Sequence, residues 1–136
     1  MRDAMKKVKE FMTAANKPMP AKPTVPTTDD VYLGMKLLRE EYTELQDALY
    51  KVTDIEGMVA VADELADLVY VICHNAHIWG IPLDRVFDEV HRSNMTKFPG
   101  EQPIYNEDGK VVKPPSYSPP RILRILRPVT KNSENV

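Results

Sequence analysis

The sequence is poor in cysteine and glycine and has no long uninterrupted apolar run. Cys73 is the only cysteine, which excludes an intrachain disulfide, and its apolar neighbours Val71 and Ile72 predict a buried, inert thiol. No glycine-rich phosphate loop is present, and no serine stands in the setting of a nucleophile elbow. The segment MRDAMKKVKE at 1–10 lacks the apolar stretch of a secretory signal. We therefore expect a soluble cytoplasmic protein with no membrane partner.

The net charge of −2 hides an uneven distribution of charge along the chain. Residues 1–28 carry 6 Lys and Arg against 2 Asp and Glu, residues 29–90 carry 4 against 14, and residues 91–136 carry 8 against 4. The three parts therefore have formal charges of +4, −10 and +4. An acidic centre between basic ends suits a site that holds cations and meets an anionic ligand at its edges. Ordinary solvated helix faces would explain much of the same count.

The spacing of apolar residues, prolines and capping residues predicts an all-α fold, a helical bundle of about four main helices. The expected helices span residues 3–16, 29–52, 53–79 and 82–97. Thr28 or Asp29 is the expected cap of the second helix, Thr53 with Glu56 has the spacing of a capping box, and Gly80 ends the third helix. The proline-rich residues 16–26 predict an extended connector.

The chain after residue 98 is rich in proline and turn residues and predicts a mostly irregular tail. Asn106 to Gly109 predicts a turn, with short strands on either side as one option. RILRILR at 121–127 suits one or two further helical turns, and residues 130–136 are expected to be disordered. The expected organisation is one domain over 1–136, with a helical core at about 29–98 and a tail over 99–136.

Two sets of acidic residues recur with one spacing on consecutive helices. Positions i, i+1 and i+4 are Glu40, Glu41 and Glu44 in the second helix and Asp63, Glu64 and Asp67 in the third. These offsets lie at roughly 0°, 100° and 40° around a helix, so each set converges on one face. On the second helix, Glu41 falls inside the apolar face, Glu44 on its border and Glu40 nearer to water.

The third helix has no polar side for its acids, because residues 58–73 contain 13 apolar residues out of 16. Acidic residues are rarely buried unless they are paired or bound to a metal. If the two helices form an antiparallel hairpin, Glu41 and Glu44 lie opposite Glu64 and Asp67. Carboxylates that close repel one another unless a cation neutralises them. Mg²⁺ or Mn²⁺, which prefer oxygen ligands, are the expected occupants.

Four segments of the sequence carry a resemblance to a known family: LLREEYTEL at 37–45, DELADLVYV at 63–71, GIPLDRVFDEVHRSNMTKF at 80–98 and DGKVVKP at 108–114. They are similar to the all-α nucleoside triphosphate pyrophosphohydrolases, the MazG-like group that includes phosphoribosyl-ATP pyrophosphohydrolases and dimeric dUTPases. The resemblance implies a Mg²⁺-dependent hydrolysis between the α- and β-phosphates of a nucleoside triphosphate, giving nucleoside monophosphate and pyrophosphate. Phosphoribosyl-ATP is the alternative substrate.

The same resemblance implies roles for individual residues. The implied metal ligands are Glu41, Glu44, Glu64 and Asp67, and Glu40 is implied to position or deprotonate the attacking water. The implied substrate contacts are Asn94 and Lys97, with Arg92, His91 and Lys110 as further candidates. Lys110 and Lys113 could close over the phosphates of a substrate, or they could simply keep a surface loop soluble. The tail, longer than the family's minimal core, suits a lid or a subunit contact.

Other interpretations of the same residues stay open at this point. Glu40 and Asp63 also fit solvated or supporting roles, and His74 and His77 have the i, i+3 spacing of a metal pair. A di-iron bundle needs E-x-x-H, which is absent. The arginines of 121–127 suggest nucleic-acid binding, but the apolar residues between them favour docking on the bundle. A third helix this apolar also suits a dimerisation module, and we expect a homodimer or homotetramer.

Overall fold

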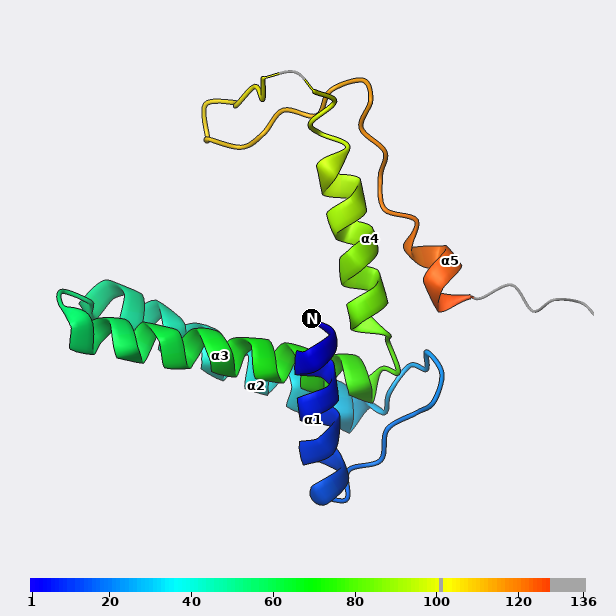
Figure 1. Cartoon of the computed structure of the whole chain (residues 1–136). Helices are drawn as coiled ribbons and strands as arrows, with labels where there is room; N and C mark the ends of the chain where they lie inside the picture. Colours follow the sequence, from blue (N-terminus) through cyan, green and yellow to red (C-terminus); the bar gives the residue numbers. More distant parts are fainter. Residues whose placement is uncertain (101, 128–136) are drawn as a thin grey trace, which may run out of the picture. The chain divides into compact units, whose positions relative to one another are not determined.

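The computed structural model describes residues 1–100 and 102–127 and confirms the expected all-α fold class. Its helices are α1 (Arg2–Ala14), α2 (Thr28–Lys51), α3 (Ile55–Ile78), α4 (Leu83–Met95) and α5 (Ile122–Leu126) (Figure 1). The β structure of the described residues is one isolated antiparallel bridge between Tyr105 and Val111, on either side of the expected turn. None of the helices in these ranges combines the length and apolar character that a membrane span requires.

The chain divides into two compact units, Met1–Leu83 and Asp84–Val136. In the first unit, α2 and α3 form the expected hairpin and lie side by side, and α1 packs across α3 (Figure 1). The buried core joins α1 to the C-terminal half of α3 through Met5, Val8, Met12, Cys73 and Ala76. Cys73 is a free, fully buried thiol, as predicted, and its burial raises its pKa. The single domain expected from the sequence stays a prediction.

The helix N-termini correct the expected caps. Thr27, and not Thr28 or Asp29, caps α2, because its hydroxyl oxygen accepts a hydrogen bond from the backbone N–H of Asp30 at 3.2 Å. Asp54, and not Thr53, caps α3 by accepting from the backbone N–H of Gly57 at 2.9 Å. In both cases the capping oxygen lies three residues before the amide that it satisfies. The sequence alone did not identify these caps, because Thr28 beside Thr27 and Thr53 beside Asp54 can cap a helix equally well.

Two helices end in the same left-handed motif. Past the end of α1, Asn16 has φ 53°, and the backbone N–H of Lys17 donates to Met12 O at 2.9 Å. Past the end of α3, Gly80 has φ 62°, and the backbone N–H of Ile81 donates to Ala76 O at 2.8 Å. These bonds satisfy carbonyls that the helix leaves free, so each chain turns sharply. The expectation that the first helix reaches Asn16 was therefore two residues too long.

The fourth helix is also shorter than expected, because α4 ends at Met95 and not at Lys97. The backbone N–H groups of Thr96 and Lys97 donate to carbonyls only three residues back, those of Ser93 and Asn94, at 3.1 Å each. Such bonds tighten the last turn and end the α-helix.

In the second unit, an ion pair on α4 holds the returning tail. Arg92 donates from Nε and Nη2 to the carboxylate of Glu89 at 2.9 and 2.8 Å. Glu89 also accepts from the backbone N–H of Arg121 at 2.7 Å, and Arg92 Nη2 donates to Pro119 O at 3.2 Å. These hydrogen bonds lower the pKa of Glu89 to about 2. The tail therefore lies along α4 and leads into α5, the short helix predicted at 121–127, while the disorder predicted for 130–136 lies outside the described residues.

Replacing Gly80 by Ala should destabilise the protein strongly. A Cβ at Gly80 would lie 2.2 Å from the backbone oxygen of Lys22 and 2.7 Å from its carbonyl carbon, and backbone atoms cannot step aside. The left-handed φ adds about 1–2 kcal/mol for a residue with a Cβ. We expect the loss in the free energy of unfolding to exceed that range, as measured by urea denaturation.

Gly109→Ala is the matched control for this prediction. Gly109 has φ 72°, but a Cβ there would meet no atom within 4 Å, so only the conformational cost applies. Equal losses for the two variants would show that the approach of Lys22 to Gly80 does not constrain the fold.

Candidate metal centre

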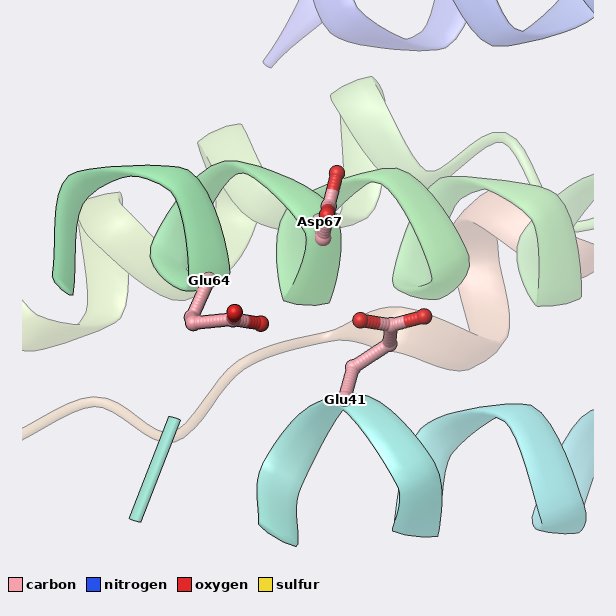
Figure 2. A group of neighbouring side chains, drawn as sticks. All are labelled: Glu41, Glu64 and Asp67. Carbon is pink, nitrogen blue, oxygen red and sulfur yellow. The ribbon is translucent and has the colours of Figure 1, made fainter. Parts of the chain in front are cut away.

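The α2–α3 hairpin brings together three of the four expected metal ligands. Glu41 of α2 extends toward Glu64 and Asp67 of α3 (Figure 2). Each of the three offers one carboxylate oxygen, and these oxygens all lie within 4.8 Å of one another. Glu41 and Glu64 are partly buried and Asp67 is exposed. We call these three residues the acidic cluster.

The surroundings of the acidic cluster disfavour its negative charge. Partial burial raises the pKa of Glu41, and the nearby charges of Glu44, Asp67, Glu64 and Glu40 raise it further. Partial burial likewise raises the pKa of Glu64, with added contributions from the charges of Glu44 and Asp67. Among the described residues, no Lys or Arg forms an ion pair with the cluster. A bound cation would supply the positive charge that the described side chains do not place at the cluster.

One atom of the cluster points to a ligand directly. Glu64 Oε2 is buried and has no hydrogen-bond partner. A buried acceptor left unsatisfied costs free energy, and such atoms are uncommon unless an ion or water completes them. A set of carboxylate oxygens from two helices is the donor set that Mg²⁺ and Mn²⁺ prefer. The residues present therefore fit a hard divalent cation.

Glu44, the fourth expected ligand, lies beside the cluster but outside the group of converging oxygens. It is exposed, and its charge is the leading electrostatic cause of the raised pKa of both Glu41 and Glu64. With Glu64 it lines a cavity of about 470 Å³ between α2 and α3. An ion pair between Lys51 and Asp47 stands on the wall of the same cavity. This cavity adjoins the acidic cluster and was not foreseen from the sequence.

The other candidate residues near the cluster have separate surroundings. Glu40, the expected base, is exposed and lies 3.8 Å from Lys36 Nζ at its nearest oxygen. Asp63 is also exposed. Of the histidines left open as a metal pair, His77 Nε2 lies 2.7 Å from Met5 O, whereas His74 is buried and its Nδ1 has no hydrogen-bond partner. Burial lowers the pKa of His74 and favours its neutral form.

The second unit holds the expected substrate residues. Asn94 Oδ1 accepts a hydrogen bond from Lys97 Nζ at 2.9 Å, so these two lie together just at the end of α4. Arg92, expected as a fork for phosphate oxygens, instead directs its fork to Glu89. His91 and Lys110 are exposed. The roles assigned to these five residues stay predictions.

Tyr117 is a residue that the sequence did not single out. Lys97 Nζ lies 5.8 Å and Lys113 Nζ 4.9 Å from the centroid of its ring. An irregular, proline-rich segment has no periodicity from which such a contact could be predicted. The resemblance indicated the lysines but not the ring that both approach.

The fold and the site define an all-α protein with a carboxylate cluster suited to a divalent cation. Residues 6–94 match the model of a family described as phosphoribosyl-ATP pyrophosphohydrolase. Because this match spans more than half of the 136 residues, the chain belongs to this family of pyrophosphohydrolases, which are hydrolases. The resemblance to the all-α pyrophosphohydrolases is thereby confirmed. A search of the curated proteins gives no match.

Replacing Glu64 by Gln should stabilise the metal-free protein and raise its melting temperature in EDTA at neutral pH by a few degrees, because one repelling charge is removed. The pKa of Glu64 is raised above 4.5 in the folded protein, so the folded state binds more protons than the unfolded state. Stability therefore falls as the pH rises through that range, and the advantage of Gln should shrink as the pH falls toward 4.5.

The same melting experiment contains its own test of metal binding. Mg²⁺ or Mn²⁺ should raise the melting temperature of the wild type and of the control Glu10→Gln, whose side chain is exposed on α1. Glu64→Gln should lose most of this increase. An equal increase in the melting temperature of all three proteins would show that the metal does not bind at the acidic cluster.

Proposed function

We propose that this protein is a divalent-cation-dependent pyrophosphohydrolase that cleaves the α–β phosphoric anhydride of a nucleoside triphosphate. The single observation that carries the proposal is the acidic cluster, in which one carboxylate oxygen from each of three residues converges and Glu64 Oε2 is buried without a hydrogen-bond partner. Membership of a pyrophosphohydrolase family supports the type of bond that is cleaved. The products are a nucleoside monophosphate and pyrophosphate.

In this proposal Glu41, Glu64 and Asp67 hold Mg²⁺ or Mn²⁺, with Glu44 beside them as a further ligand. When bound, the cation supplies positive charge that offsets the charge developing on the phosphates and lowers the pKa of water. The protein's part is to fix the carboxylates before the substrate arrives. Packing of α2 on α3 does this, because Glu41 reaches the cluster from one helix and its two partners from the other.

Glu40 is the proposed general base. Its carboxylate is exposed, one residue from Glu41, and its weak pairing with Lys36 at 3.8 Å leaves it able to accept a proton. The water oxygen forms a bond to one phosphorus of the anhydride, the bond from that phosphorus to the bridging oxygen breaks, and the water's proton passes to Glu40. The bridging oxygen leaves with the other phosphate.

Phosphoribosyl-ATP is the second candidate substrate, and the description of the matched family favours it. It contains the same α–β anhydride as a nucleoside triphosphate, so the acidic cluster would serve both in the same way. The two candidates differ in the base-bearing part of the molecule and not in the anhydride. A panel of nucleotides that includes phosphoribosyl-ATP, assayed for released pyrophosphate, separates them.

Glu41→Gln should lower kcat by at least about a hundredfold in Mg²⁺ while the protein stays folded, because a neutral amide is a poor ligand for a hard cation. The measurement is pyrophosphate release from the best nucleotide of the panel. Glu56→Gln is the matched control, since Glu56 is an exposed acid in the first turn of α3. Near-normal turnover by Glu41→Gln, or turnover by the wild type in EDTA, would refute the proposed role.

The proposal includes a homodimer or homotetramer, supported by apolar side chains that one chain leaves exposed on α3. Met58, Val59 and Leu65 are 58%, 66% and 51% exposed. All three lie in the N-terminal half of α3, away from the buried contact with α1. Burying such a row of side chains against a second copy would remove a large apolar area from water.

Val59→Lys should therefore shift the protein toward monomers in light scattering after size-exclusion chromatography, because a charge at a buried interface is strongly disfavoured. Val25→Lys is the control, since Val25 is 79% exposed in the connector between α1 and α2. A monomeric wild type, or an unchanged mass for Val59→Lys, would contradict the proposed assembly.

A further inference from the structure

A buried histidine without a role in the proposed function lies on the C-terminal half of α3. His74 is 9% exposed, and the preceding residue, Cys73, belongs to the core that α1 covers. Both α1 and α2 pack against α3. The charged groups that act on the ring come from all three helices or their ends: Lys17 after α1, Asp30 in the first turn of α2 and His77 of α3. The protonation state of His74 therefore affects packing that the three helices share.

The surroundings of this ring favour its neutral form. Nδ1 of His74 is buried and has no hydrogen-bond partner among the described residues. An imidazolium carries an N–H group on both ring nitrogens, so in the charged form Nδ1 is a donor that meets no acceptor. A buried donor without an acceptor costs free energy, and so does a buried charge without a close partner. Protonation of His74 therefore opposes the packing around it.

The neighbouring charges act mostly in the same direction. Burial is the main cause that lowers the pKa of His74 from 6.5, and the charges of Lys17 and His77 lower it further, whereas the charge of Asp30 raises it. The carboxylate of Asp30 already accepts a hydrogen bond from the hydroxyl of Thr27 at 2.9 Å. A state in which the ring reaches water binds the proton more readily. The packed state therefore loses stability as the pH falls below about 6.5.

The contacts of α1 and of the connector after it differ in their response to acid. His77 Nε2 donates to Met5 O of α1 at 2.7 Å, and a histidine that gains a proton keeps this donor. The connector leaves a cavity of about 370 Å³ whose lining includes Ile78, one turn of α3 beyond His74. Past this cavity the backbone N–H of Thr24 donates to Trp79 O at 2.9 Å. His74 is thus the acid-sensitive contact, while the connector stays attached to the end of α3.

We propose that His74 makes the docking of α1 on α3 sensitive to mild acid, so that its protonation loosens α1 and opens the core beneath it to solvent. In the docked form Cys73 is fully buried in one cluster with Met5, Val8 and Met12 of α1. The accessibility of its thiol therefore follows the position of α1. The proposal does not rest on the proposed function, because it uses no residue of the acidic cluster.

The test is the rate at which Cys73, the only cysteine of the chain, reacts with dithiodipyridine, a thiol reagent that remains active in acid. Each rate is divided by that of the urea-unfolded protein at the same pH, which cancels changes in the reactivity of the thiol itself. From about pH 7.5 to about pH 5.5 the relative rate of the wild type should rise at least about threefold. The limit is about tenfold for one histidine with an ordinary pKa of about 6.5 once α1 has loosened.

Variants at two positions tie this rise to His74. His74→Gln and His74→Leu, two neutral replacements of similar size, should both abolish it, and the use of two guards against a packing defect in either. Lys17→Gln should reduce the rise, because one charge that disfavours the protonated ring is removed. A merely structural role for His74 would not respond to Lys17. His91→Gln is the matched control and should keep the full rise, since His91 is an exposed histidine of α4.

Three results would overturn the proposal. The first is a relative rate of the wild type that does not rise in acid. The second is an equal rise in the wild type and in both His74 variants, which would place the acid-sensitive group elsewhere. The third is loss of the helical circular dichroism signal of the wild type at the lower pH, because the whole protein, and not α1 alone, would then have opened.

Discussion

The repulsion between carboxylates of α2 and α3 is the constraint on which the rest of the first unit depends. Two helices pack closely here although the surfaces that face each other carry Glu41 and Glu64. The close approach is secured elsewhere along the pair, where Asn75 Nδ2 donates to Gly34 O at 3.4 Å and a Cβ at position 34 would lie 2.0 Å from Asn75 Oδ1. Leu45, also buried, adds apolar contact. Because the packing of α2 on α3 elsewhere outweighs the repulsion between their carboxylates, the acids are held in place before a cation binds. Such preorganisation is what a cation site requires.

Along α3, three tasks are separated by position. The C-terminal part supplies Cys73 and Ala76 to the core with α1, the middle supplies Glu64 and Asp67, and the N-terminal half leaves Val59 and its apolar neighbours exposed. This explains why α3 is apolar on every side, since no single neighbouring element covers the whole helix. The apolar residues of this helix are therefore divided between the buried core of the first unit and an exposed surface.

The parts of the fold that obey a periodicity were predictable from the sequence. Apolar spacing gave the positions of the four main helices, and the i, i+1, i+4 spacing of the acids indicated that Glu41, Glu64 and Asp67 would meet. Cap registers were missed by one residue because Thr27 and Thr28 have the same chemistry. The path of the tail could not be predicted from the sequence. Hydrogen bonds such as that from Ser118 N–H to Thr96 Oγ1 join irregular segments that have no periodic pattern of residues. The ion pair between Arg92 and Glu89 was also not predicted, because a sequence shows that a residue is charged but not which residue it pairs with.

The proposed function also accounts for an electrostatic cost within the first unit. The acidic cluster contains carboxylates with raised pKa values, and no ion pair offsets them among the described residues. Such a concentration of like charge is unfavourable unless a cation joins it. A divalent cation supplies the missing charge and a partner for the buried oxygen of Glu64, whereas a purely structural role for α2 and α3 would leave that oxygen as a cost to the folded state.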